Sequence, residues 1–320
     1  MFLRLSWLTA GVVSLAFGCS GVVGPRFPAQ SMKDPVLGRE YLLFRPARYS
    51  RELAWPLIIA CPGRFPDSPK AQMEAWGSLA EANGLLLAVP TLASTRARIQ
   101  QRPERLTARF REDERHLLAV LQHIRAGHQV ADDRVFLYAW EEGAPAALYT
   151  ALRNRELFRA VALASPSFDE AGLQDVAGAV DPYLPIYVHF PVSDAITGKH
   201  GRRLADWLRS RGADLRDDSR GPVRHSDTQQ ALAFFQDVLR RGPKLSLWVL
   251  AMPEQPRGYR LGVQSSEPVD AIHWDFGDGD AADLQEPIHV YASAGPHRVK
   301  AHIVDSKGRE HRRALDLVVP

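Results

Sequence analysis

Residues 135–145 read VFLYAWEEGAP, an apolar strand pattern that ends abruptly in two glutamates and a run of small residues. A stretch of helical character follows, and a second apolar run lies at 160–165. Small residues after a strand allow the chain to turn sharply and let neighbouring backbones approach closely. The segment therefore predicts a tight turn from a buried strand into a helix, with Glu141 at the turn.

Apolar runs and helical periods alternate on both sides of this turn. Nearly continuous apolar runs predict buried strands at 56–61, 85–90, 134–140, 160–165 and 185–190. Helices are predicted around 73–84, 117–127, 204–212 and 232–239, the first with a stop at Asn83-Gly84. Alternation of this kind is typical of the α/β class, in which a mostly parallel sheet carries helices on both faces.

The region from about residue 36 to 241 resembles the α/β-hydrolases, in particular the secreted esterases of the polyhydroxybutyrate-depolymerase and feruloyl-esterase type. Short phrases carry the resemblance in the family's order, and they lie at 61–63 (CPG), 76–90, 133–135 (DRV) and 157–161 (LFRAV). The resemblance covers about two thirds of the chain. It implies an α/β-hydrolase fold in which the turn after residue 140 is the nucleophile elbow.

In that family a serine on the elbow, an acid and a histidine follow one another in chain order. The resemblance places Glu141 at the nucleophile position, Asp194 at the acid position and His225 at the base position. It places the oxyanion-hole positions on Arg64 and Glu142. Asp194 has an alternative role as a loop or helix-capping acid, and His225 has one as a surface-loop histidine.

The elbow carries glutamate where acyl transfer needs serine. A histidine base activates serine by removing its proton, and an ionised glutamate has no proton to give. The sequence therefore favours a pseudo-hydrolase that acts by binding or scaffolding. The alternative is a secreted carboxylic-ester hydrolase in which Glu141 is a carboxylate nucleophile, as the elbow aspartate is in haloalkane dehalogenases, or in which Glu141 or Glu142 activates water with His225. Ser165 and Ser167 are further candidates for a nucleophile, although they follow the wrong strand.

The first 18 residues combine one positive charge with an apolar stretch, which indicates a secretory signal too short for a spanning helix. The ending LAFGC at 15–19 resembles a bacterial lipobox and implies that Cys19 is lipidated. An ordinary cleaved signal is the alternative. Residues 19–35 are then predicted to form a tether. We expect an exported lipoprotein, anchored to a membrane of the bacterial cell envelope on its periplasmic or surface side.

Composition limits the remaining function classes. The chain of 320 residues is 45% hydrophobic, which is enough for two domains with real cores. Its 40 basic and 37 acidic residues leave a formal net charge of +3 without a basic face, so no nucleic-acid partner is expected. Cys19 and Cys61 are the only cysteines, and no cofactor or metal cluster is predicted from them. The expected partners are an envelope protein or a polysaccharide or polyester ligand.

The pattern changes at residue 242. Ile272, Trp274 and Phe276 alternate with polar residues, as do the positions at 299–303 and 315–319, and turn residues separate these runs. Alternating short strands with such turns predict a β-sandwich over 242–320. The sequence WDFGDG at 274–279 is similar to the signature of PKD domains, an immunoglobulin-like module of secreted bacterial proteins.

Four acids crowd the turns that follow this signature, at 275, 278, 280 and 283. Such a cluster raises the hypothesis of a Ca²⁺ site, because hard cations prefer several oxygen ligands. Short acids in tight turns also bond to their own backbone. The sequence favours this second interpretation.

Overall fold

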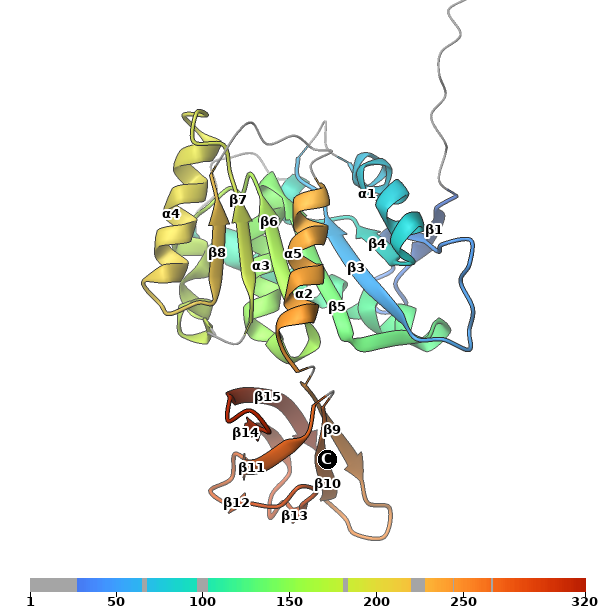
Figure 1. The fold of residues 1–320 in the computed structure, drawn as a ribbon, viewed down its shortest axis with the longest axis vertical. Helices are drawn as coiled ribbons and strands as arrows, with labels where there is room; N and C mark the ends of the chain where they lie inside the picture. The colour runs from blue at the N-terminus through green and yellow to red at the C-terminus, as the bar shows by residue number, and fades with distance from the viewer. Residues whose placement is uncertain are drawn as a thin grey trace, which may run out of the picture.

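The computed structural model describes residues 28–64, 68–96, 103–180, 184–219, 228–243, 245–265 and 267–320. It consists of a larger body of helices and strands and a smaller body of strands at the C-terminal end (Figure 1). Within the described part of the chain, none of the helices has both the length and the apolar character that crossing a membrane requires.

The larger body is built on one eight-stranded sheet. Its strands are β1 (Gln30–Lys33), β2 (Glu40–Phe44), β3 (Trp55–Cys61), β4 (Leu86–Pro90), β5 (Val130–Trp140), β6 (Ala160–Ala164), β7 (Ile186–His189) and β8 (Leu215–Asp218). Its helices are α1 (Pro69–Asn83), α2 (Pro103–Gly127), α3 (Ala144–Arg153), α4 (Thr197–Arg209) and α5 (Thr228–Arg241). Short 3-10 turns are η1 (Ser94–Arg96), η2 (Glu141–Gly143), η3 (Arg155–Leu157) and η4 (Ala171–Ala179). The five predicted buried strands and the predicted helices are all present.

The strands lie in the order β1-β2-β4-β3-β5-β6-β7-β8. The pairs β1–β2 and β2–β4 are antiparallel, and the sheet is parallel from β4 to β8. A mostly parallel sheet of this kind needs helices on both faces, because its central strands are apolar on both sides. The carboxyl ends of β3, β5, β6 and β7 therefore meet at one edge of the sheet, where ligands of open α/β sheets bind.

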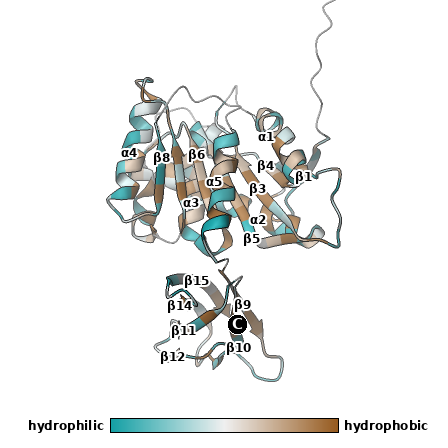
Figure 2. Cartoon of the chain, viewed as in Figure 1, coloured by the Kyte–Doolittle hydropathy of each residue, from teal (hydrophilic) through white to brown (hydrophobic). Residues whose placement is uncertain are grey.

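Each face of the sheet has its own core. Leu57 and Ile59 of β3 pack with Val120 of α2 on one face, and Ile58 packs with residues of α1 and α5 on the other. This division follows from the strand period of two, which sends successive side chains to opposite faces. Figure 2 shows hydrophobic residues concentrated in the central strands and hydrophilic ones on the outer sides of the helices.

The N-terminal edge of the sheet corrects the predicted tether. Residues 19–35 were expected to lie outside the domain, but Gln30–Lys33 form β1 and pair with β2. Asp34 follows, almost fully buried, and its Oδ2 lies 2.8 Å from Nδ1 of His116 in α2. An edge strand that is exposed on most positions has no apolar run, so hydrophobic patterning cannot detect it. The folded domain thus includes Gln30.

The smaller body contains two antiparallel sheets. One has the order β13-β10-β9 and the other the order β12-β11-β14-β15. The strands are β9 (Leu245–Ala251), β10 (Gly258–Ser265), β11 (Val269–Asp275), β12 (Ala281–Ala282), β13 (Ile288–Val290), β14 (Gly295–Asp305) and β15 (Glu310–Val319). The predicted alternating runs correspond to β11, β14 and β15.

Trp274 lies at the centre of this sandwich. Its side chain is fully buried among residues of both sheets, including Leu261, Val299 and Ile303. Its indole Nε1 donates a hydrogen bond to the carbonyl of Leu284 at 2.9 Å. The ring therefore fills the core and satisfies its one polar group, as a buried tryptophan must.

The two bodies meet at the edge of the large sheet opposite to the carboxyl ends of its parallel strands. Helix α5 ends at Arg241, whose carbonyl accepts a hydrogen bond from Nη1 of Arg309 at 3.2 Å. Strand β9 lies near β5, and β15 lies near η3. Figure 1 shows the smaller body below the larger one, at the end where α5 finishes.

Asp305 ties the last hairpin of the smaller body together. Its carboxylate is fully buried and accepts hydrogen bonds from Nε of Arg309 at 2.7 Å, from Nε2 of His311 at 2.8 Å and from the backbone of Lys307 at 2.9 Å. Burial alone would raise the pKa of Asp305, but the hydrogen bonds from His311 and Arg309 outweigh burial and hold the pKa well below its ordinary value.

Acid is therefore expected to destabilise the smaller body through Asp305. Because its folded-state pKa is depressed, its contribution is fully present above the unfolded pKa of about 4 and is lost as the pH falls below that value. Urea unfolding of the full chain at neutral pH and near pH 3 measures this loss. Asp305→Asn should be less stable at neutral pH and less acid-sensitive, whereas Asp270→Asn, at an exposed acid of β11, should behave like the parent. Equal acid sensitivity in parent and Asp305→Asn would contradict this.

Candidate functional site

The predicted turn after β5 is present. Glu141 begins η2 with a φ of 44°, a left-handed conformation that a residue with a side chain adopts only under local strain. A Cβ atom on Gly143 would lie 2.4 Å from the carbonyl oxygen of Pro62 and 2.9 Å from that of Cys61. Only glycine permits this close approach between the turn and the end of β3. The strand-to-helix elbow is thus built as the sequence predicts, with glutamate at its apex.

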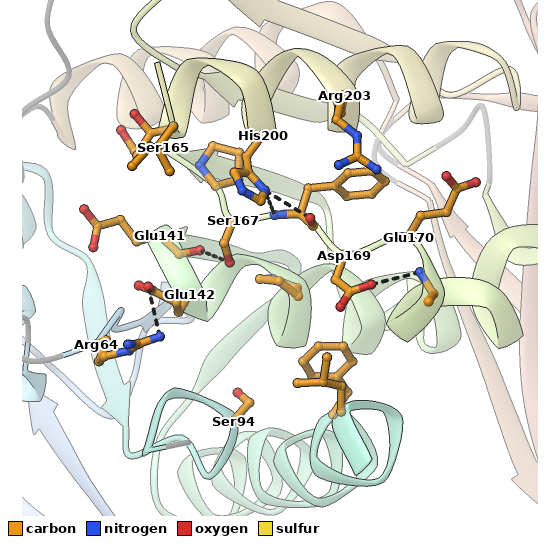
Figure 3. Close-up of a pocket in the computed structure, with 18 of the residues that line it drawn as sticks. Arg64, Ser94, Glu141, Glu142, Ser165, Ser167, Asp169, Glu170, His200 and Arg203 are labelled. Atoms are coloured by element: carbon orange, nitrogen blue, oxygen red, sulfur yellow. Dashed lines mark hydrogen bonds and ion pairs between the residues drawn. The ribbon is translucent and has the colours of Figure 1, made fainter. Parts of the chain in front are cut away.

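A cavity of about 900 Å³ opens above the elbow, at the carboxyl edge of the parallel strands (Figure 3). Glu141 and Glu142 line it from the elbow, and α4 lines it from the opposite side. Its apolar surface comes mainly from α2, the loop after β6 and the start of α4, and includes Leu106, Phe110, Pro145, Phe168 and Ile196. Its size is typical of small-molecule sites.

The side chains at the two predicted oxyanion-hole positions pair with each other. Nη2 of Arg64 lies 3.5 Å from Oε1 of Glu142, and both residues are about one third exposed. Nε of Arg64 and Oε2 of Glu142 are buried and have no hydrogen-bond partner among the described residues. The same holds for Oγ of Ser94 in the neighbouring turn η1. This wall of the cavity therefore has unused hydrogen-bonding capacity.

Asp113 of α2 fixes the loop that carries Ser94. Its fully buried carboxylate accepts hydrogen bonds from the backbone N–H of Ala93 at 2.6 Å and of Ser94 at 2.9 Å. Arg39 donates to the same carboxylate at 3.0 Å. The sequence gives no sign of this role, because Asp113 lies in a helix far along the chain from η1.

The structure places Asp194 on the surface. It follows β7, as the resemblance implied, but it is exposed, and its Oδ1 accepts hydrogen bonds from the backbone N–H of Ile196 at 2.8 Å and of Thr197 at 2.7 Å. These bonds keep the pKa of Asp194 below its ordinary value. Asp194 is not among the described residues that line the cavity. Its contacts fit the helix-capping alternative.

His225 lies outside the described residues, so its predicted pairing with Glu141 stays a prediction. Cys19 also lies outside them. Cys61 is fully buried at the end of β3, and burial together with the nearby charge of Asp113 raises the pKa of its thiol well above the ordinary value. A thiol in this state is a poor nucleophile.

Two serines beside the elbow are held by the backbone. Ser165, with a φ of 45°, donates its N–H to the carbonyl of His189, and Ser167 donates its N–H to the carbonyl of Glu141 at 3.1 Å. Both line the cavity. His200 also lines the cavity. Its Nδ1 lies 3.0 Å from both the backbone N and the backbone O of Phe168. His200 is therefore tied to the loop after β6.

Solved structures with a similar fold are esterases. A structure of one of two fungal esterases from Rhizomucor miehei matches with a TM-score of 0.52 at 10% identity, over 67% of this chain and 83% of its own. A ferulic acid esterase from Anaeromyces mucronatus, in complex with ferulic acid, matches with a TM-score of 0.52 at 14% identity, over 68% of this chain and 91% of its own. A search of curated proteins found no matching sequence.

Residues 261–319 match the family model of the PKD domain. The chain is an α/β-hydrolase fold followed by a PKD domain. Both predictions of fold class are thereby confirmed. At identities this low, the similarity to the esterases shows the fold alone.

The acidic turn of the PKD domain is engaged in its own hydrogen bonds. Asp275 accepts from the backbone of Gly277 at 2.9 Å, and Asp278 accepts from the backbone of Asp280 at 3.2 Å. Asp278 also pairs with Nε2 of His289 at 2.7 Å. Ligand atoms of Asp278, Asp280 and His289 lie within 4.8 Å of one another. The backbone bonds match the interpretation that the sequence favoured for these acids.

Two residues of the cavity wall were not predicted from the sequence. His200 and Arg203 of the α/β-hydrolase domain stand three positions apart on α4, and both line the cavity. The available signal was their helical spacing directly after the strand that ends at the cavity. That signal is weak in a helix rich in basic residues.

Proposed function

We propose that the α/β-hydrolase domain has lost serine-esterase activity and acts as a binding domain. The observation that carries this proposal is Glu141 on the strained elbow, lining the cavity where the fold presents a serine nucleophile. A glutamate ionised at neutral pH offers no proton to a general base and cannot form the alkoxide that attacks an ester. Loss of the nucleophile from a catalytic triad removes on the order of a million-fold in rate.

The surroundings of Glu141 add to this. An ester carbonyl that was attacked here would develop negative charge beside the carboxylates of Glu141 and Glu142, and hydrolysis needs donors at that place. The exposed position of Asp194 leaves the expected acid of the triad away from the described cavity wall. The cavity itself is open and large enough for a small molecule or the end of a polymer. Binding without turnover is the function that these features support together.

A carboxylate-based ester hydrolase is the second candidate. One observation favours it, because the positive φ of Glu141 is the strain that holds an elbow nucleophile at the cavity. A glutamate is one methylene longer than the aspartate of enzymes with such a mechanism, and a misplacement of about 1 Å costs roughly a hundred-fold in rate. Turnover of short esters by the parent chain and by Glu141→Ala separates the two candidates.

The PKD domain serves adhesion or spacing in this proposal. It contacts the α/β-hydrolase domain at the end opposite to the cavity, through β9 beside β5 and through the bond from Arg309 to the carbonyl of Arg241 in α5. A partner on the PKD domain therefore need not compete with a ligand in the cavity. This two-sided arrangement supports a scaffolding role, with an envelope protein or a polysaccharide or polyester as the partner.

We further propose that the chain is exported and anchored to a bacterial envelope membrane through Cys19. The support is the signal-like segment at 1–18 and the sequence LAFGC that ends it. The mature protein should partition into the detergent phase, and Cys19→Ala should shift it to the aqueous phase. A single acyl chain binds membranes only marginally, so firm retention requires the complete lipid modification. Recovery of an unmodified N-terminus at another residue would contradict the anchor.

A further inference from the structure

Most charged side chains in the cavity wall are already engaged. Arg64 pairs with Glu142. Glu170 pairs with Arg211 at 3.6 Å, and Asp169 accepts a hydrogen bond from the backbone at the start of η4 at 3.0 Å. These groups therefore have their opposite charge or their donor before any ligand arrives.

Arg203 differs from them. Its guanidinium carbon lies 5.7 Å from the ring centre of Phe168, and it makes no ion pair with any residue in the described ranges. Phe168 is 4% exposed, and its ring centre lies 5.9 Å from that of Trp207, which is in α4 as Arg203 is. An exposed arginine thus lies beside a buried aromatic ring at the cavity wall. Its charge is not neutralised by a carboxylate of the described chain.

His200 adds a hydrogen-bond donor beside it. In the neutral tautomer that is protonated on Nε2, Nδ1 accepts a hydrogen bond from the backbone N–H of Phe168. If the ring becomes charged, Nδ1 donates to the carbonyl of Phe168 and Nε2 still carries a proton. In these two forms Nε2–H is a donor without a partner among the described residues, and an entering carboxylate selects them over the neutral tautomer in which Nδ1 donates to the carbonyl of Phe168 and Nε2 is an acceptor.

The spacing of the two residues makes them one site. Positions 200 and 203 lie on the same side of α4, because residues three apart on a helix are neighbours. Figure 3 shows both on the α4 side of the cavity, with His200 near Ser167 and Arg203 farther from Glu141, Glu142 and Arg64. The elbow end carries the carboxylates of Glu141 and Glu142, whereas the α4 end carries the guanidinium of Arg203 and, where Nε2 is protonated, the Nε2–H of His200. An anion that enters the cavity therefore finds at Arg203 a positive charge that is not yet paired with a described carboxylate, whereas Arg64 at the elbow is already paired with Glu142.

We propose that the α4 wall is a carboxylate subsite, and that the cavity binds a free organic acid with its carboxylate on Arg203 and His200. The apolar body of the acid would lie against Phe110, Leu106 and Ile196. The guanidinium of arginine matches a carboxylate with two parallel hydrogen bonds, and such charge-assisted bonds are about twice as strong as neutral ones. This inference rests on the proposed binding function, and it names the ligand as the acid and not its ester.

Calorimetric titration of the full chain tests the subsite with two acids, hydrocinnamate and hexanoate, and with their methyl esters. At least one acid should bind about tenfold or more tightly than its ester, since one such ion pair is worth about one factor of ten in affinity. Arg203→Gln should weaken the acid by about tenfold and leave the ester unchanged, so that the preference disappears. Arg202→Gln is the matched control, because Arg202 is the exposed neighbour of Arg203 outside the described cavity wall and should bind both like the parent.

Three outcomes overturn the subsite. They are no binding of either acid at about 10 mM, equal binding of acid and ester by the parent chain, and an unchanged preference in Arg203→Gln. A thermal melt of Arg203→Gln that matches the parent shows that lost affinity is not lost folding. His200→Gln, which keeps a donor but loses the imidazole, should reduce the preference by less than Arg203→Gln. Chromatography of the methyl esters after titration tests the proposed loss of esterase activity separately. Hydrolysed ester would contradict that proposal. The preference for acid over ester would still be judged from the binding data.

Discussion

Purified protein is expected to hydrolyse short p-nitrophenyl esters no faster than a background rate. The reason is chemical, because Glu141 stands on the elbow with a φ of 44° and lines the cavity where the fold presents serine. In a serine hydrolase, removal of the nucleophile costs on the order of a million-fold in the rate constant, which leaves only what binding and an oxyanion hole contribute. Initial rates over a range of enzyme concentrations, set against heat-denatured protein, measure the effect.

If hydrolysis is measured, single substitutions identify the residue that acts as the nucleophile. Robust turnover that disappears in Glu141→Ala would establish a carboxylate mechanism and refute the pseudo-hydrolase proposal. Turnover that survives Glu141→Ala but disappears in Ser165→Ala would move the nucleophile to the loop after β6. Ser219→Ala is a matched control on the loop after β8, and it should change neither result because Ser219 is not part of the described cavity wall. Hydrolysis at background in all variants supports binding without turnover.

The sequence predicted the core of the α/β-hydrolase domain because buried parallel strands have a strong apolar signal. Residues 56–61 and 134–140 lie in β3 and β5, and Gly84 ends α1 with a φ of 64° as the predicted stop. The elbow was predictable for a similar reason, since small residues after an apolar strand leave few alternatives. These features depend on interactions that are local or shared by a whole strand.

Both edge strands of the sheet were missed. Strand β1 reads QSMK and β8 reads LRDD, and most of their residues are exposed or half-buried. They form because the edges of β2 and β7 offer unpaired backbone groups, so pairing is decided by tertiary structure and not by their own side chains. A tether assigned from polarity alone therefore included residues that belong to the sheet.

The candidate site divides in the same way. Glu141, Glu142 and Arg64 could be placed at the cavity because the elbow and the end of β3 are adjacent in every sheet of this topology. Asp194 could not be distinguished from a capping acid, because both roles put a carboxylate after β7. The α4 side depends on the packing of Phe168 against Trp207, which no sequence period encodes.

Trp274→Ala is expected to unfold or nearly unfold the PKD domain. The side chain is fully buried, and its replacement leaves a cavity among residues of both sheets and an unpaired carbonyl at Leu284. Truncation of a buried tryptophan costs roughly 3–5 kcal/mol in the free energy of unfolding. A small domain has a total stability of about 5 kcal/mol or a little more, so little would remain. Urea unfolding of the full chain should then lose the transition of the PKD domain and keep that of the larger domain.

Trp248→Ala is the matched control in the same domain. Trp248 is half-buried on β9, and its ring covers Gly262 on the neighbouring strand, since a Cβ there would lie 2.1 Å from the ring. It is absent from the described core of the sandwich, so its loss should cost about 1 kcal/mol, the ordinary value for a point substitution. Equal effects of the two substitutions would mean that Trp274 is not the centre of the core.

Unfolding of a fragment of residues 242–320 tests whether the PKD domain folds independently of the rest of the chain. Its core contains Leu245 and otherwise residues further along the chain, so the fragment should unfold cooperatively and show β-type circular dichroism. The contact of Arg309 with Arg241 is a hydrogen bond at a partly exposed guanidinium, and its loss should cost no more than about 1 kcal/mol. A fragment that is disordered, while the full chain is folded, would show that the domain depends on the α/β-hydrolase body. It would then be an extension of that body, and the proposal of a separate scaffolding module would fail while the cavity of the larger domain remained unaffected.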